Sequence, residues 1–227
     1  ALEKMSMLKC QSVVMPYLLG KGKTATASWI LQSPLLSGCF SSNDLQNEHI
    51  AFLSDLVQKS VQVVPLILSD VWKYLHVLLK SPVLPIKVNF ELEKTFVVAL
   101  CERLKEWDAE NLNKPWPFTV AHGDFAPWNM RMINGKVALY DWEYFMSLAP
   151  VGWDVLYFIF RVENLIKRQS LEQIWRKFKS GAYLEKLILF EKRSGVTIPD
   201  KNLLAMLVIL AIALDLSPKM IADTLVT

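Results

Sequence analysis

The sequence predicts an α+β fold that is predominantly helical and contains one short β-hairpin. After residue 154, apolar residues recur with helical periodicity almost to the end of the chain. Before that point, the pair Asn134-Gly135 separates two short apolar stretches, 130–133 and 136–140, which is typical of a hairpin with a type I′ turn. With 52% hydrophobic and 21% charged residues, the 227 residues can bury one sizeable core.

The first predicted element is a strand at residues 12–19, where β-branched and apolar residues run up to Gly20. Residues 21–42 are rich in Gly, Ser, Thr and Pro, which predicts a connector rather than a periodic element. Asn43 or Asp44 is then expected to cap a helix. The apolar face of that helix consists of Leu45, Phe52, Leu53, Leu56 and Val57.

A second amphipathic helix is predicted where apolar residues repeat every four positions from Leu92 to Leu104, and the prolines at 115 and 117 should stop the chain from continuing it. The Pro-interrupted stretch 65–85 has no clear period. Residues 118–121 predict a short strand that leads into a loop. The helices expected after the hairpin are 155–166, 171–190 and 200–216.

Composition also bounds the function. A net charge of +3 with dispersed basic residues does not favour nucleic acid or an anionic membrane surface as a partner. Three widely spaced cysteines, Cys10, Cys39 and Cys101, fit reduced thiols in a cytoplasmic protein. The longest uncharged apolar run, 203–214, would span about 18 Å as a helix against the ~30 Å of a hydrocarbon core, so a buried core helix is expected.

The strongest chemical signal is a loop between a strand and the hairpin. Residues 122–129 read His-Gly-Asp-Phe-Ala-Pro-Trp-Asn, and the second hairpin strand delivers Asp141-Trp142-Glu143. Transfer of a γ-phosphoryl group requires a carboxylate beside the acceptor hydroxyl and oxygen ligands for Mg²⁺. Asp124 and Asn129 lie five residues apart on one compact loop, and the hairpin returns Asp141 as a second metal ligand.

These motifs resemble the aminoglycoside phosphotransferase and choline kinase family, whose members are relatives of the protein kinases. Pro150 and Asp154 follow in the order and spacing of the family. The resemblance implies a remnant of the N-terminal lobe and hinge strand at residues 1–20. A kinase-like C-terminal lobe would follow at 21–227, with the catalytic loop at 122–129 and the metal-binding segment at 141–143.

The implied activity is transfer of the γ-phosphate of ATP, with Mg²⁺, to a hydroxyl of a small molecule, which could be an aminoglycoside, choline or ethanolamine, a sugar or an amino-alcohol. By resemblance Asp124 is the catalytic base, and Asn129 and Asp141 are the Mg²⁺ ligands. His122 would brace the loop. Glu143 and Asp154 would lie near the acceptor pocket or support it.

The resemblance further implies that the adenine meets the backbone at Met15, Tyr17 and Leu18. Trp128, with Trp142 and Trp153, either walls a substrate pocket or is ordinary core material. Helix capping would explain Asp154 as well as a role at the acceptor pocket.

Two alternatives stand beside this interpretation. Residues 20–24, Gly-Lys-Gly-Lys-Thr, invite a phosphate-loop interpretation, but Tyr17 occupies the position where such a loop needs glycine. No glycine-rich loop and strand lysine precede the expected hinge, so the N-lobe was removed, or is supplied otherwise, or the chain is a degenerate fragment. A non-catalytic kinase-like binding module is therefore the alternative function. Self-association through the surface that faces the N-lobe is a further expectation.

Overall fold

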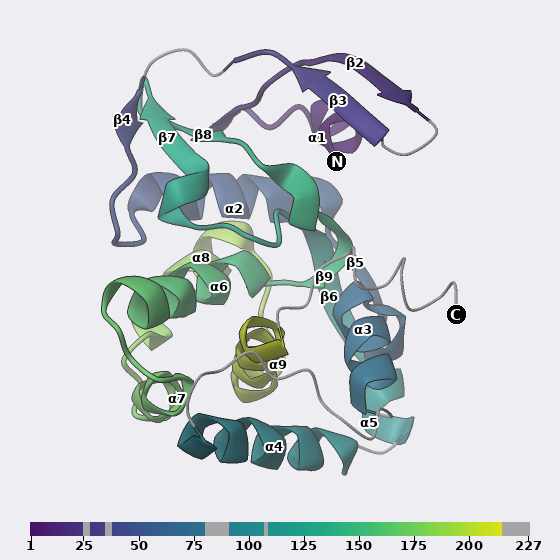
Figure 1. The fold of residues 1–227 in the computed structure, drawn as a ribbon, viewed down its shortest axis with the longest axis vertical. Helices are drawn as coiled ribbons and strands as arrows, with labels where there is room; N and C mark the ends of the chain where they lie inside the picture. The colour runs from purple at the N-terminus through teal and green to yellow at the C-terminus, as the bar shows by residue number, and fades with distance from the viewer. Residues whose placement is uncertain (25–27, 35–37, 80–90, 107–108, 215–227) are drawn as a thin grey trace.

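The computed structural model describes residues 1–227 except 25–27, 35–37, 80–90, 107–108 and 215–227 (Figure 1). The helices are α1 (Leu2–Leu8), α2 (Asn47–Ser60), α3 (Asp70–Leu79), α4 (Glu91–Lys105), α5 (Ala109–Asn113), α6 (Trp153–Arg161), α7 (Leu171–Lys179), α8 (Leu184–Ser194) and α9 (Lys201–Leu214). The strands are β1 (Val13–Val14), β2 (Leu18–Lys23), β3 (Ser28–Gln32), β4 (Cys39–Phe40), β5 (Gln62–Pro65), β6 (Pro115–Ala121), β7 (Met130–Ile133), β8 (Lys136–Leu139) and β9 (Met146–Pro150). The predicted mixture of α and β structure is confirmed.

The hairpin β7–β8 has the predicted turn. The two strands are antiparallel, with Met130 opposite Leu139, and both turn residues have positive φ, 50° at Asn134 and 71° at Gly135. Asn and Gly tolerate that conformation better than other residues, which is why the pair predicts the turn so well. The hairpin is the centre of a sheet with the order β1-β8-β7-β4, in which β1 is parallel to β8.

The N-terminal part differs from the prediction. The single strand expected at 12–19 is divided into β1 and β2, and the expected connector at 21–42 contains β3 and β4. β2 and β3 form an antiparallel pair. In β2, Gly20 and Gly22 occupy the half-buried positions that alternate with exposed Lys21 and Lys23, so the strand carries a period of two without the apolar residues that reveal it. The predicted boundary after residue 20 falls inside β2.

Helix α2 begins later than expected. Neither Asn43 nor Asp44 caps it. Gln46 is the N-cap and forms a reciprocal capping box with His49, whose Nδ1 accepts from the Gln46 N–H at 2.9 Å. The predicted apolar face is confirmed, since Leu45, Phe52, Leu53, Leu56 and Val57 are all buried.

The second amphipathic helix is confirmed as α4, with buried Leu100 and Leu104 and partly buried Phe96, although the side chain of Leu92 lies outside the described residues. The stretch at 65–85 contains α3 in its described part, and the prolines at 115 and 117 open β6 rather than only ending a helix. The long helix expected at 171–190 is wrong. It is two helices, α7 and α8, because the chain turns at Gly181 with a φ of 92°.

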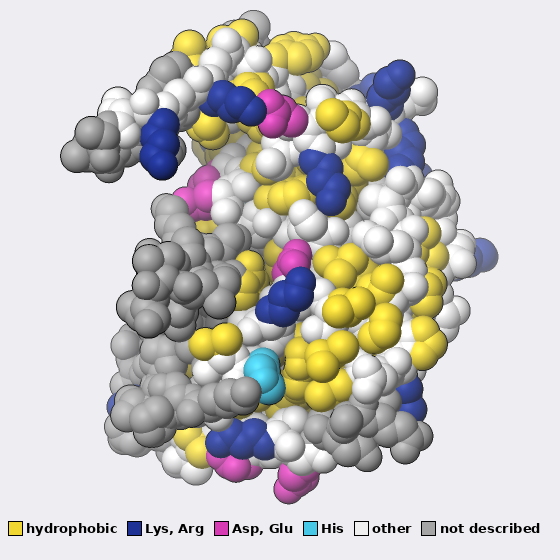
Figure 2. Space-filling view, turned by 90° about the vertical axis from the view of Figure 1, so that its right-hand side faces the viewer, with side chains coloured by type: hydrophobic (Ala, Val, Ile, Leu, Met, Phe, Trp, Pro, Cys, Tyr) yellow, Lys and Arg dark blue, Asp and Glu magenta, His cyan; other side chains and the backbone are white. Residues whose placement is uncertain are grey.

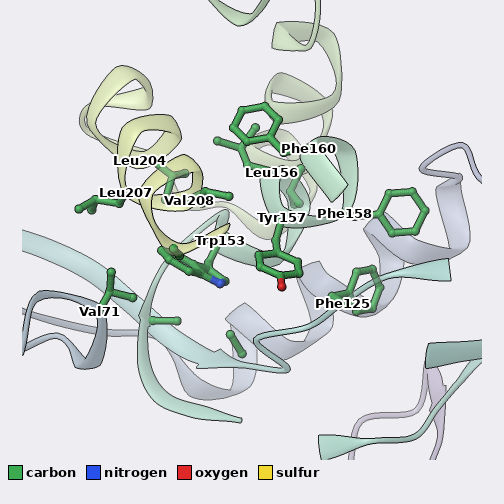
Figure 3. Packing of buried hydrophobic residues seen from close by; sticks show 14 of the residues in the cluster. Val71, Phe125, Trp153, Leu156, Tyr157, Phe158, Phe160, Leu204, Leu207 and Val208 are labelled. Atoms are coloured by element: carbon green, nitrogen blue, oxygen red, sulfur yellow. The ribbon is translucent and has the colours of Figure 1, made fainter. Parts of the chain in front are cut away.

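Helix α9 is the buried core helix predicted at 203–214. It is apolar on all sides and contacts α4, α6 and α7, which surround it in the lower part of Figure 1. Figure 3 shows Leu204, Leu207 and Val208 of α9 beside Trp153 and Leu156 of α6. None of the described helices is long and apolar enough to cross a bilayer. The core therefore fixes α6, the helix that lies behind the loop at 122–129.

Candidate functional site

The loop at 122–129 is held from behind by Asp154, in the first turn of α6. Its two carboxylate oxygens accept from the backbone N–H groups of His122 at 2.8 Å and Gly123 at 3.1 Å. The Asp154 side chain is buried, and burial raises its pKa to about 7 against the opposing effect of the two hydrogen bonds. The structure thus places Asp154 as a support of the loop. Its capping interpretation is wrong, because Gly152 is the N-cap of α6.

His122 is buried beneath the same loop. Its Nε2 lies 3.0 Å from the carbonyl oxygen of Tyr140, and its Nδ1 accepts from the Asp124 N–H at 3.3 Å. A carbonyl oxygen only accepts, so these partners assign the proton to Nε2. Burial lowers the pKa of His122 to about 4, which keeps the ring neutral. These are the contacts that a bracing residue makes, and that role stays a prediction.

Gly123 lets the loop approach the segment after the hairpin. Its φ is 85°, and a Cβ built on it would lie 2.0 Å from the carbonyl oxygen of Tyr144. No other residue type combines this conformation with so close a contact. The glycine of the His-Gly-Asp motif is therefore required by the backbone.

Phe125 anchors the loop on the hydrophobic core. Its side chain is fully buried, and its ring centroid lies 5.9 Å from those of Phe52 in α2 and Phe158 in α6. Figure 3 shows Phe125 and Phe158 on the side of α6 away from α9. Two residues later Pro127 begins a short 3₁₀ turn, Pro127–Asn129, to which its fixed φ is suited. Asp124, between two immobilised neighbours, remains partly exposed.

The predicted base and one predicted metal ligand are hydrogen-bonded to each other. The Asn129 Nδ2 donates to the Asp124 Oδ2 at 2.7 Å and to the Asp124 carbonyl oxygen at 3.0 Å. The other carboxylate oxygen, Oδ1, is buried and has no hydrogen-bond partner in the described part of the chain. Such an oxygen is one that a substrate hydroxyl could satisfy. Because the amide nitrogen of Asn129 is engaged by Asp124, its Oδ1 is the atom that remains for a cation.

Asp141 lies directly after the hairpin, which is tied to the loop by a hydrogen bond from the Tyr140 N–H to the Asn129 carbonyl oxygen, 3.1 Å. Asp141 has a left-handed backbone, with φ 61° and ψ 65°. That conformation costs a non-glycine residue about 1–2 kcal/mol and is concentrated at functional sites. The hairpin therefore brings Asp141 back toward Asn129, as the sequence predicts.

A cavity of about 460 Å³ opens beside Asp141. It is lined by Ala1, Leu2, Glu3, Leu18, Lys21, Ile30, Gln32, Asp141, Trp142 and Glu143. Its walls thus come from α1, the β2–β3 hairpin and the segment 141–143. Figure 2 shows the surface hollowed below the hairpin at the top of the molecule, with acidic side chains beside the hollow.

The three predicted adenine contacts do not share this cavity. Leu18 lines it, but Met15 packs against the core. The backbone of Tyr17 is already paired with Ser33, since its N–H donates to the Ser33 Oγ at 2.8 Å and its carbonyl accepts from the Ser33 N–H at 2.9 Å. Met15 and Tyr17 do not line this cavity, and their contact with the adenine stays a prediction. Sequence reasoning missed Ile30 and Gln32 because it took their strand for a connector.

The donor set fits magnesium. In the described part of the chain no three His, Cys, Asp or Glu side chains gather as a metal site. Magnesium does not require one, because it is commonly held by one or two protein oxygens together with phosphates and water. The Oδ1 of Asn129 and the carboxylate of Asp141 are hard oxygen donors of that kind. Glu143 lies on the same cavity.

Sequence reasoning also missed two residues of α6, Tyr157 and Arg161. Burial raises the pKa of Tyr157 well above its usual range, and the nearby charge of Asp124 raises it further. The Arg161 guanidinium carbon lies 5.7 Å from the centroid of the Trp128 ring and 5.8 Å from that of Tyr157. The signal was available, because the spacing i, i+3, i+7 from Asp154 places Tyr157 and Arg161 on the face that meets the loop.

Comparison with known protein families points to the same region of the chain. A family model described as the phosphotransferase enzyme family matches residues 84–184, which contain the loop, the hairpin and the segment 141–143. No curated protein matches the chain. Over these residues the chain is similar to a family of phosphotransferases, so the predicted resemblance is confirmed. Trp128, on the loop, and Trp142, on the cavity, both fall within the match.

Proposed function

We propose that this chain transfers the γ-phosphate of ATP, with Mg²⁺, to a hydroxyl group of a small molecule. The observation that carries the proposal is the Asp124 carboxylate. One of its oxygens is oriented by Asn129, and the other is buried without a partner among the described residues. A carboxylate in this state is ready to accept a hydrogen bond from an acceptor hydroxyl.

Each residue of the site has a separate task in this proposal. Asp124 accepts the proton of the acceptor hydroxyl as the oxygen attacks the γ-phosphorus, while the bond from that phosphorus to the β–γ bridging oxygen breaks and ADP leaves. Asn129 holds the Asp124 carboxylate and offers its own Oδ1 to the metal, and Asp141 offers a carboxylate from the other side of the loop. When bound, Mg²⁺ neutralises charge on the β- and γ-phosphates. Asp154 and His122 keep the loop backbone in place.

The cavity beside Asp141 is the proposed nucleotide site. Its volume of about 460 Å³ lies within the usual range for small-molecule pockets. Leu18, Ile30 and Trp142 supply apolar surface for a base, while Lys21 supplies a positive charge. Lys21 is already paired with Glu3 at 2.7 Å, so a phosphate would compete with that carboxylate.

The first experiment is titration calorimetry of ATP into the chain with and without Mg²⁺. Wild type should bind only with the metal, and Asp141→Ala should lose that binding. Asp44→Ala, an exposed aspartate outside the loop and hairpin, is the matched control and should bind as wild type. Binding that is insensitive to both Mg²⁺ and Asp141 would refute the nucleotide site.

The second experiment tests catalysis. Asp124→Asn removes the proton acceptor and nearly preserves shape, so phosphoryl transfer should fall by about 10²–10⁴-fold while Mg²⁺-dependent ATP binding is retained. Unchanged turnover in this variant would contradict the assignment of Asp124. Metal-dependent binding without turnover in wild type, over a panel of hydroxyl compounds, would favour a non-catalytic binding module.

The partner and location expectations stay predictions. A small hydroxyl compound is the proposed substrate, and a cytoplasmic location, with neither nucleic acid nor membrane as partner, remains the expectation from composition.

A further inference from the structure

Helix α6 presents three residues to the catalytic loop, one on each successive turn. Asp154 holds the loop backbone, Tyr157 lies one turn later beside Asp124, and Arg161 lies one further turn along, against Trp128. At a rise of about 1.5 Å per residue, Arg161 is roughly 6 Å beyond Tyr157 along the helix. A positive charge is therefore placed a short distance from the predicted catalytic carboxylate.

Arg161 has no acceptor for its N–H groups within the described residues. It is half-buried, and its Nε is fully buried without a hydrogen-bond partner. Its two contacts are the faces of Trp128 and Tyr157, which stabilise the cation but leave the donors at the edge of the guanidinium unused. Leaving the buried Nε–H donor unsatisfied is costly, so a ligand with acceptor oxygens is favoured at this position.

Two other arginines, Arg131 and Arg176, have acceptors among the described residues. Arg131 donates to the Met130 carbonyl at 2.9 Å and to the Tyr140 hydroxyl at 3.0 Å. Arg176 donates to the Glu172 carboxylate at 2.6 Å. Arg103, Arg168 and Arg193 have no acceptor among the described residues either, but their side chains are exposed to water, whereas Arg161 is half-buried with its Nε fully buried.

We propose that Arg161 binds an oxyanion, a carboxylate or phosphate group, carried by the acceptor whose hydroxyl meets Asp124. This inference rests on the proposed function and names its substrate class, a small hydroxy acid or hydroxyalkyl phosphate. Guanidinium matches both oxyanions with two parallel hydrogen bonds. The same charge repels a cationic acceptor, so aminoglycosides and choline are disfavoured here.

The test is binding and phosphorylation of small hydroxyl compounds, three of which share a three-carbon skeleton. Glycerate supplies a carboxylate and glycerol 3-phosphate supplies a phosphate, while glycerol is the neutral probe and choline the cationic one. Binding of each is measured by calorimetry, with and without Mg²⁺ and a non-hydrolysable ATP analogue. The variants are Arg161→Gln, Arg161→Lys and the exposed control Arg176→Gln, each checked for folding by its melting temperature.

Wild type is expected to bind at least one anionic probe more tightly than glycerol and choline. Arg161→Gln should weaken that binding by about tenfold or more, while Arg161→Lys, which keeps the charge, should recover part of it. Arg176→Gln should bind as wild type. Nucleotide affinity should not change in any of the three, and the phosphorylated anion should show a raised KM in Arg161→Gln with a smaller change in kcat.

The proposal is overturned if Arg161→Gln binds the anions as wild type does, or if neither anion binds wild type, or if choline binds more tightly than both. It is also overturned if Arg161→Gln weakens the nucleotide instead, because Arg161 would then serve the phosphates of ATP. Failure of the proposed function has a different signature, the absence of Mg²⁺-dependent nucleotide binding in wild type. In that case the titrations of the anionic probes without nucleotide still test whether Arg161 binds the anion.

Discussion

Asp154 should make wild type less stable as pH rises toward 7, and replacing it with asparagine should remove this dependence. Burial raises the pKa of Asp154 to about 7 from an ordinary value of 3.8. Between these values the folded chain keeps a proton on Asp154 that the unfolded chain has lost. The folded state then binds more protons than the unfolded state, so the contribution of Asp154 to stability falls as pH rises from about 4 to 7.

The size of the effect follows from the same shift. Each pH unit well inside the window corresponds to about 1.4 kcal/mol, and the slope falls off near the pKa, so the free energy of unfolding of wild type should fall by about 2 kcal/mol between pH 5 and pH 7 relative to Asp154→Asn. His122 and His49, whose pKa values burial lowers to about 4, act in the opposite direction between about pH 4 and 6.5. Both histidines are present in the two proteins, so the difference between the curves isolates Asp154.

The assay is urea unfolding of both proteins at pH 5, 6 and 7, monitored by tryptophan fluorescence. Asp200→Asn is the matched control, because Asp200 also accepts from two backbone N–H groups, those of Asn202 and Leu203, but at a partly exposed helix start. Its free energy of unfolding should stay close to that of wild type at all three pH values, because asparagine caps a helix about as well as aspartate. The reasoning is refuted if the stability of wild type relative to Asp154→Asn stays constant or rises from pH 5 to 7.

Two further predictions concern packing and association. Gly123→Ala should lower the free energy of unfolding in urea by about 3 kcal/mol or more, because the added Cβ would collide with the Tyr144 carbonyl. Gly135→Ala, which has a similar φ but open space around it, should cost about 1 kcal/mol. Equal losses in the two variants would contradict the close contact at Gly123. Self-association should appear as a concentration-dependent mass in sedimentation equilibrium and weaken in Leu19→Lys, and a monomer at every concentration would exclude it. The exposed apolar side chains that motivate it are Tyr17, Leu19, Ile30 and Leu31.

The hairpin and the loop were predictable because their signals are local. Asn134 and Gly135 adopt the positive φ that their chemistry tolerates, and the loop follows from a continuous motif. The β2–β3 pair was not predictable, because Gly20 and Gly22 occupy positions where apolar residues would have shown the alternation of buried and exposed side chains typical of a strand. For the same reason the cavity walls at Ile30 and Gln32 were missed.

Other features depend on contacts between distant segments. Nothing local separates α7 from α8 except Gly181, and a single glycine is often tolerated inside a helix. The roles of Asp154 and Arg161 likewise depend on which segment packs against α6, and the sequence near them does not specify it. Only the loop motif and the i, i+3, i+7 spacing, taken together, point to that face.

The position of Asp154 on α6 also explains how one buried carboxyl group can serve the loop in either protonation state. The group lies in the first turn of the helix, where the macrodipole favours negative charge, and it receives two backbone hydrogen bonds. These effects oppose the cost of burial, which explains a pKa near neutrality rather than far above it. When protonated, the group has one oxygen that still accepts fully, so the loop keeps part of its support below pH 7. Asparagine offers the same single oxygen at every pH, so Asp154→Asn should match wild type in stability below about pH 4, and wild type should become the less stable of the two as pH rises toward 7.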